Sequence, residues 1–79
     1  MNPPGTSPIR VLIADDHPMM REGIAATLTA HGGIEVVAQA RDGDEAIQFF
    51  TSRRPDVALL DLQMPGKDGL EAIRAIRSL

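Results

Sequence analysis

Three aspartates occupy positions in the chain where their side chains could do chemistry. Asp15 and Asp16 follow the apolar run Ile9 to Ala14, and Asp61 lies near the end of a second apolar run, Val57 to Leu62. Both runs are too short to favour helices and are bounded by turn-forming residues, so each predicts a buried β-strand. All three carboxylates are therefore expected at strand ends, partly in water.

A parallel sheet would bring these carboxylates together, because every strand then points its carboxyl end the same way. If the first and third strands are neighbours, Asp15, Asp16 and Asp61 share one crevice. Three carboxylates repel one another, by roughly 4 kcal/mol per pair at 4 Å with an effective dielectric constant near 20. A hard divalent ion would remove that strain, and Mg²⁺ prefers a few carboxylate oxygens together with waters and a phosphate. Asp61 could then attack a phosphoryl group in line and form an acyl phosphate.

The segments between the strands carry helical patterns. His17-Pro18 opens the first helix, in which Met20, Ile24 and Leu28 recur at helical spacing and predict its buried face. Asp44 is the predicted cap of the second helix. The expected order is strand Ile9–Ala14, helix 18–30, strand Ile34–Ala40, helix 44–53, strand Val57–Leu62 and a last amphipathic helix beginning near Leu70. This alternation predicts an α/β fold, a doubly wound parallel sheet with right-handed crossovers and helices on both faces.

Composition narrows the class of protein. The chain has 79 residues, 43% of them apolar and 24% charged, which is typical of one small soluble globular domain. It has no cysteine, which excludes a disulfide framework and a thiolate zinc site and fits a cytoplasmic location. The net charge of −3 and the scattered basic residues give no stripe for nucleic acid. Residues 1–8 are expected to be a flexible lead-in, and no segment is apolar enough to span a membrane.

Two motifs resemble a known family. Leu12-Ile13-Ala14-Asp15-Asp16-His17-Pro18, followed by Leu60-Asp61-Leu62-Gln63-Met64-Pro65-Gly66-Lys67-Asp68-Gly69, is similar to the receiver domain of bacterial two-component response regulators, most closely the LuxR/NarL-type transcription regulators. The resemblance spans residues 9–79. It implies a flavodoxin-like (CheY-like) fold, of which this chain carries three βα units.

The resemblance also implies a role for each site residue. Asp61 would be the phosphoacceptor, taking a phosphoryl group from the phosphohistidine of a sensor histidine kinase, and the chain would not be a turnover enzyme. Asp16 directly and Asp15 partly through water would hold Mg²⁺, with Asp61 itself and the backbone carbonyl of Gln63 as further ligands. Such a receiver controls transcription, and it would reach DNA only through an output domain absent from this chain.

The family pattern extends beyond three βα units, and two of its residues have no counterpart here. They are a serine or threonine after the fourth strand and a lysine after the fifth, since Lys67 lies in the loop after the third. Phosphorylation of this chain is therefore expected to be impaired. The strand Val57 to Leu62 would form a bare sheet edge, which predicts a homo-oligomer that pairs through it.

Two other functions compete with this interpretation. One is an interaction or oligomerisation module that is not phosphorylated because its site is incomplete. The other is a phosphatase of the haloacid-dehalogenase kind, whose chemistry requires a second aspartate two residues after the nucleophile, where this chain has Gln63. His17 is interpreted as a helix-start residue in preference to a ligand or phosphodonor.

Overall fold

The structure is a computed structural model that describes residues 7–61 and 69–78. Strands and helices alternate as the sequence predicts. Their bounds are β1 Ile9–Ala14, α1 Pro18–His31, β2 Ile34–Ala40, α2 Gly43–Arg53, β3 Val57–Leu60 and α3 Gly69–Arg77. The first six residues of the predicted lead-in lie outside the described residues, as do Leu62 and Gln63 with the rest of the loop up to residue 68.

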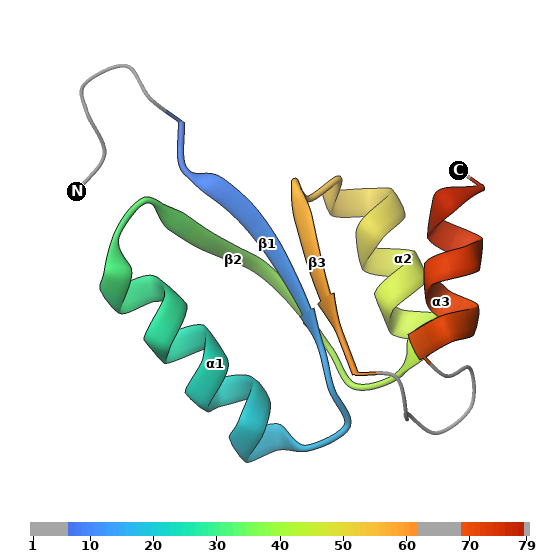
Figure 1. The fold of residues 1–79 in the computed structure, drawn as a ribbon, viewed down its shortest axis with the longest axis horizontal. Coiled ribbons are helices and arrows are strands. Elements are labelled where there is room, and N and C mark those ends of the chain that lie inside the picture. Colours follow the sequence, from blue (N-terminus) through green and yellow to red (C-terminus); the bar gives the residue numbers. More distant parts are fainter. Residues whose placement is uncertain (1–6, 62–68, 79) are drawn as a thin grey trace.

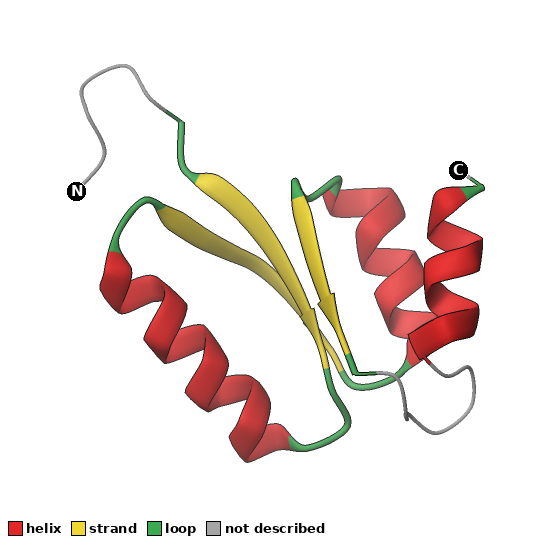
Figure 2. Cartoon of the chain, viewed as in Figure 1, coloured by secondary structure: helices red, strands yellow, loops and turns green. Residues whose placement is uncertain are grey.

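The three strands form one parallel sheet in the order β2-β1-β3. Helix α1 covers one face of this sheet, and α2 and α3 lie side by side on the other (Figure 1). Coloured by secondary structure, the chain shows the sheet as a twisted middle layer between helices (Figure 2). The prediction of a doubly wound parallel α/β sheet is confirmed, including the adjacency of the first and third strands.

Strand β1 is the centre of the core. Its last four residues, Val11 to Ala14, are at most 4% exposed, because strands pair on both of their edges and helices lie over both faces of the sheet. Side chains alternate between the faces of a strand, so Leu12 and Ala14 pack on the α2 side, against Ala46 and Phe49 among others. The strand that leads into Asp15 is therefore firmly held.

The predicted face of α1 is less buried than expected. No residue of α1 is buried, Met20 is 55% exposed, and Ile24 and Leu28 are half-buried. The reason is where the helix lies: α1 packs against β2 and β1, which leaves an apolar groove between the helix and β3 among the described residues. Met20 lines this groove and does not fill the core.

The cap of α2 is Asp42 and not the predicted Asp44. The Asp42 carboxylate accepts a hydrogen bond of 2.8 Å from the backbone N–H of Glu45, three residues into the helix, while Asp44 is an exposed residue of the first turn. Both aspartates flank Gly43, and the helix starts after the one whose oxygen reaches an unpaired N–H.

The start of β3 is tied to β1 at the end of the sheet opposite Asp61. Asp56 donates its N–H to the carbonyl of Arg10 at 2.8 Å, and the N–H of Arg10 donates to the Asp56 carboxylate at 2.9 Å. These two bonds fix the register in which Val11 pairs with Val57 and Ala14 with Leu60. None of the described helices is both long and apolar enough to cross a membrane.

Candidate functional site

The carboxyl ends of β1 and β3 place Asp15 and Asp61 on the same rim of the sheet. The parallel hydrogen-bond ladder continues one residue beyond each strand: the N–H of Asp15 donates to the carbonyl of Ala40 at 3.0 Å, and the N–H of Asp61 donates to the carbonyl of Ala14 at 2.9 Å. The backbones of both aspartates are thus held by the sheet itself.

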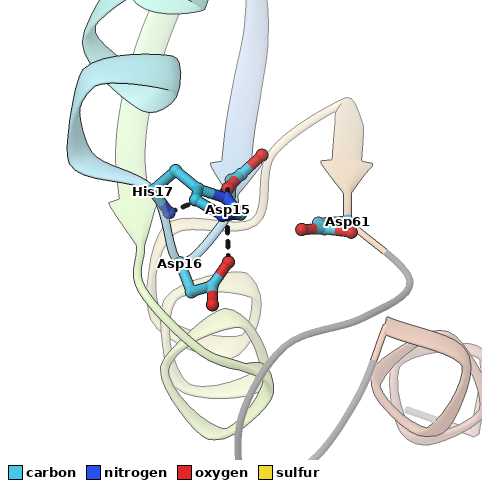
Figure 3. A group of neighbouring side chains, drawn as sticks. All are labelled: Asp15, Asp16, His17 and Asp61. Atoms are coloured by element: carbon cyan, nitrogen blue, oxygen red, sulfur yellow. Dashed lines mark hydrogen bonds and ion pairs between the residues drawn. The ribbon is translucent and has the colours of Figure 1, made fainter.

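Four side chains converge at this rim. One ligand atom from each of Asp15, Asp16, His17 and Asp61 can be chosen so that all four atoms lie within 4.8 Å of one another. Figure 3 shows the first three grouped where β1 passes into α1, with the Asp61 carboxylate facing them from the end of β3. The structure therefore brings together the three predicted aspartates, whereas Gln63, the fourth predicted ligand, lies outside the described residues.

His17 makes a contact that sequence reasoning missed. It is the N-cap residue of α1, as predicted, but its side chain makes no capping hydrogen bond. Instead, its Nδ1 lies 2.7 Å from Asp15 Oδ1 and 3.0 Å from Asp16 Oδ1, and its backbone N–H donates to Asp15 Oδ1 at 2.8 Å. Proximity in sequence was the only signal, because a sequence does not tell which way an imidazole at a helix start will turn.

Arg21 was also missed. Its Nη1 donates a hydrogen bond of 2.6 Å to the carbonyl oxygen of Asp15, and its N–H donates to the carbonyl of His17 at 3.0 Å as part of the first turn of α1. The usable signal was its position: a residue one turn into a helix that starts at the rim can reach back to the strand end. Arg21 thereby fixes the link between β1 and α1.

The charges of the rim shift the protonation of two groups. The pKa of the Asp15 carboxyl is lowered, mainly because the backbone N–H of His17 donates to its charged form, with further help from the His17 ring and the nearby Arg21. The pKa of the His17 imidazole is raised by its hydrogen bond to Asp15 and by the negative charge of Asp16. When it is protonated, His17 is the positive partner of the two carboxylates.

The residues present fit a divalent cation. Asp16 Oδ1 is shielded from water and accepts no hydrogen bond from the described residues, although His17 Nδ1 is near it. A buried carboxylate oxygen without a donor is costly unless a cation completes its surroundings. Because the donors at this rim are mostly carboxylate oxygens, they suit a hard ion such as Mg²⁺.

Comparison with known proteins gives a family match. Residues 11–79 match the response regulator receiver domain. The chain is 44% identical over 78 residues to the probable transcriptional regulatory protein NarL of Mycobacterium tuberculosis (strain H37Rv), a match that covers 99% of this chain and 36% of that protein. It is 50% identical over 68 residues to the transcriptional regulatory protein LiaR of Bacillus subtilis, covering 86% of this chain and 32% of the relative. The chain therefore spans about a third of the length of these relatives.

Solved structures agree with the sequence match. The signal receiver domain of the putative response regulator NarL from Mycobacterium tuberculosis superposes with a TM-score of 0.89 at 44% identity, over 92% of this chain and 59% of that one. The predicted receiver fold is therefore confirmed by the comparison of sequences and by the comparison of structures.

Proposed function

We propose, from the premise that this chain belongs to the response regulator receiver domain family, that Asp61 accepts a phosphoryl group from a phosphohistidine of a sensor histidine kinase. The proposal rests on the position of Asp61, which shares one rim of the sheet with Asp15 and Asp16 and has a ligand atom within 4.8 Å of theirs. Three neighbouring carboxylates need a cation to offset their negative charge. A site for phosphoryl transfer uses such a cation, because a metal ion neutralises the charge on the transferred phosphoryl group.

The reaction follows from these positions. An oxygen of the Asp61 carboxylate forms a bond to phosphorus, the bond from phosphorus to the kinase imidazole nitrogen breaks, and its electron pair stays on that nitrogen. Asp16 directly and Asp15 partly through water would hold Mg²⁺, together with the Asp61 carboxylate and the backbone carbonyl of Gln63. The bound ion would supply neutralisation of the negative charge on the transferred oxygens. Asp61 acts once for each phosphoryl group received, so the chain is proposed to be a signalling domain and not a turnover enzyme.

The phosphorylated rim would be a charge switch. A phosphoryl group adds about −1.5 to −2 charges next to two existing carboxylates. We place this event in the cytoplasm, where the kinase would meet the chain, and its output in the control of transcription through a DNA-binding domain of the longer protein.

The alternatives are weaker. A haloacid-dehalogenase-like phosphatase would need an acid where Gln63 stands, and the family match is to a receiver domain. An interaction module without phosphorylation would leave the convergence of Asp15, Asp16 and Asp61 without a purpose.

The test is to label the chain with a small phosphoryl donor such as acetyl phosphate in Mg²⁺ and to locate the label by mass spectrometry. The proposal predicts a label on Asp61, none in Asp61→Asn, and an unchanged label in Asp44→Asn. Asp44→Asn is a matched control because Asp44 is exposed on the first turn of α2 and lies outside the site. A label on another residue, or equal labelling of Asp61→Asn, would overturn it. The experiment is decided by which residue carries the label and not by how much label is incorporated, because phosphorylation of this chain is expected to be impaired.

We also propose that this chain forms a homo-oligomer, a two-fold dimer or a larger assembly, through β3. Among the described residues β3 is an edge strand, and the side chains of Val57 and Leu59, on the sheet face next to this edge, are 43% and 41% exposed. Exposed apolar edges of this kind pair with other strands. Sedimentation should show self-association that Leu59→Lys abolishes and Met19→Lys, a similar change on the 86% exposed Met19 of α1, does not. A stable monomer at high concentration would dispose of the proposal.

A further inference from the structure

The position of His17 Nδ1 relative to the aspartates is that of a neighbouring metal ligand. Ligands around an ion at bond lengths near 2.1 Å stand about 3 Å apart when they are adjacent in an octahedron. His17 Nδ1 lies 2.7 Å from Asp15 Oδ1 and 3.0 Å from Asp16 Oδ1. The same nitrogen belongs to the group of four ligand atoms that includes Asp61. An ion seated between Asp16 and Asp61 would therefore find a nitrogen donor within reach.

Neither helix capping nor packing explains this orientation of the ring. His17 begins α1 without a side-chain capping bond, and its side chain is 69% exposed, so the ring is free of the constraints of a core. The contacts that orient it are those with Asp15 and Asp16. An exposed imidazole can turn by a small angle to direct its lone pair to an ion that replaces its proton.

The buried oxygen of Asp16 gives a second reason to expect an ion at this point. Asp16 Oδ1 is shielded from water and makes no hydrogen bond with the described residues, although it forms an ion pair with His17 Nδ1 at 3.0 Å. An ion bound to this oxygen would satisfy it and would lie next to His17 Nδ1, because the two atoms are 3.0 Å apart.

A nitrogen ligand changes which ion is preferred. Carboxylate and water oxygens suit Mg²⁺, whereas imidazole suits Zn²⁺, Cu²⁺ and Ni²⁺. Affinities for sites with nitrogen and oxygen ligands rise from Mn²⁺ to Cu²⁺ and are lower again for Zn²⁺. We infer that His17 Nδ1 is a direct ligand at this rim, and that the site binds a transition-metal dication such as Zn²⁺ through Asp16, Asp61 and His17. The inference deepens the proposed function and rests on it, because the two share Asp16 and Asp61.

The experiment compares Zn²⁺ and Mg²⁺ binding at one fixed pH by calorimetry, using the whole chain, His17→Ala and His31→Ala. His31 is the matched control because it is the only other histidine and is an exposed residue at the opposite end of α1. The inference predicts that His17→Ala weakens Zn²⁺ binding by at least about tenfold, the lower end of the loss seen when even an outer-shell partner of a metal is removed. Mg²⁺ binding should be retained in both variants, which also shows that they are folded.

Nitrogen NMR of the two imidazole rings gives a second readout. Zn²⁺ should shift the Nδ1 signal of His17 to the range of a metal-bound nitrogen and leave both nitrogens of His31 unchanged. Unchanged or tighter Zn²⁺ binding in His17→Ala would overturn the inference, because the ring would then be only a cation that the metal displaces. If Mg²⁺ binds and is lost in Asp16→Asn, that outcome leaves the proposed function standing. If neither ion binds the unmodified chain, the inference and the cation site of the proposed function fail together.

Discussion

The backbone N–H of Asp61 donates a hydrogen bond of 2.9 Å to the carbonyl of Ala14, the residue that precedes Asp15. This bond joins the two acidic motifs of the chain through the main chain of the sheet, so their approach does not depend on flexible side chains. The central strand that carries Ala14 is the most buried element in the described part of the chain. The geometry of the rim is consequently a property of the fold, and changes in the core are expected to reach it.

Replacing the buried Leu12 should destabilise the chain strongly. Leu12 is 0% exposed and packs in the core between the sheet and α2, so Leu12→Ala removes apolar contacts and leaves a cavity. The expected loss in the free energy of unfolding is about 2–5 kcal/mol, much of the stability of so small a domain. Urea unfolding followed by circular dichroism measures it, with Met19→Ala, at an 86% exposed position, as the control. Equal effects of the two changes would contradict the assignment of the core.

Removing the cap of α2 should cost about 1 kcal/mol. Asp42→Ala deletes the carboxylate that accepts from the Glu45 N–H, whereas Asp44→Ala deletes an exposed carboxylate that makes no capping bond. Urea unfolding of the two variants should therefore separate them, with only Asp42→Ala clearly destabilised. The reverse order would show that the helix begins after Asp44.

The pKa of His17 should fall when its main partner is neutralised. In chelator-treated protein the pKa of the imidazole lies above its ordinary value of 6.5 because Asp15 accepts its hydrogen bond and Asp16 supplies a negative charge. Asp15→Asn removes the larger of these effects. Proton NMR titration of the His17 ring should show the pKa moving down towards 6.5. A pKa that does not change in Asp15→Asn would mean that the ring does not face this carboxylate in solution.

The same contact should make stability depend on pH. Because the folded pKa of His17 is raised, the stability it contributes is fully present below the unfolded value near 6.5 and is lost as the pH rises through the folded pKa. The pKa of Asp15 is lowered, so its contribution is present above the ordinary value of 3.8 and is lost as the pH falls through the folded pKa. The difference in unfolding free energy between the chain and His17→Ala should therefore be largest in mildly acidic buffer and shrink in alkaline buffer. A difference that does not vary with pH would contradict this.

Much of the fold could be predicted because strand and helix patterns here are strong. The apolar runs Ile9 to Ala14 and Ile34 to Ala40 predicted the bounds of β1 and β2 without error, and the expected parallel pairing put the strand ends at one rim. The convergence of Asp15, Asp16 and Asp61 followed from that topology alone. The sites that a sequence predicts well are thus those fixed by the backbone.

The wrong or missing predictions concern side chains for which the sequence allows more than one conformation or partner. Asp42 and Asp44 are equally good capping residues, and only the helix geometry decides between them. Met20 lies at a core spacing, yet α1 leans towards β2 and leaves it in a groove. His17 and Arg21 form local contacts whose directions depend on rotamers, which no spacing rule determines.

Binding of Mg²⁺ to the rim shows whether the aspartates of β1 and β3 form one site. Calorimetric titration of the chain, Asp16→Asn, Asp61→Asn and the control Asp44→Asn asks whether residues from β1 and β3 hold one ion between them. We expect one Mg²⁺ site in the chain and in Asp44→Asn, and severely weakened binding in both Asp16→Asn and Asp61→Asn. Binding that persists unchanged in either rim variant would contradict the shared site and, with it, the proposed role of Asp61.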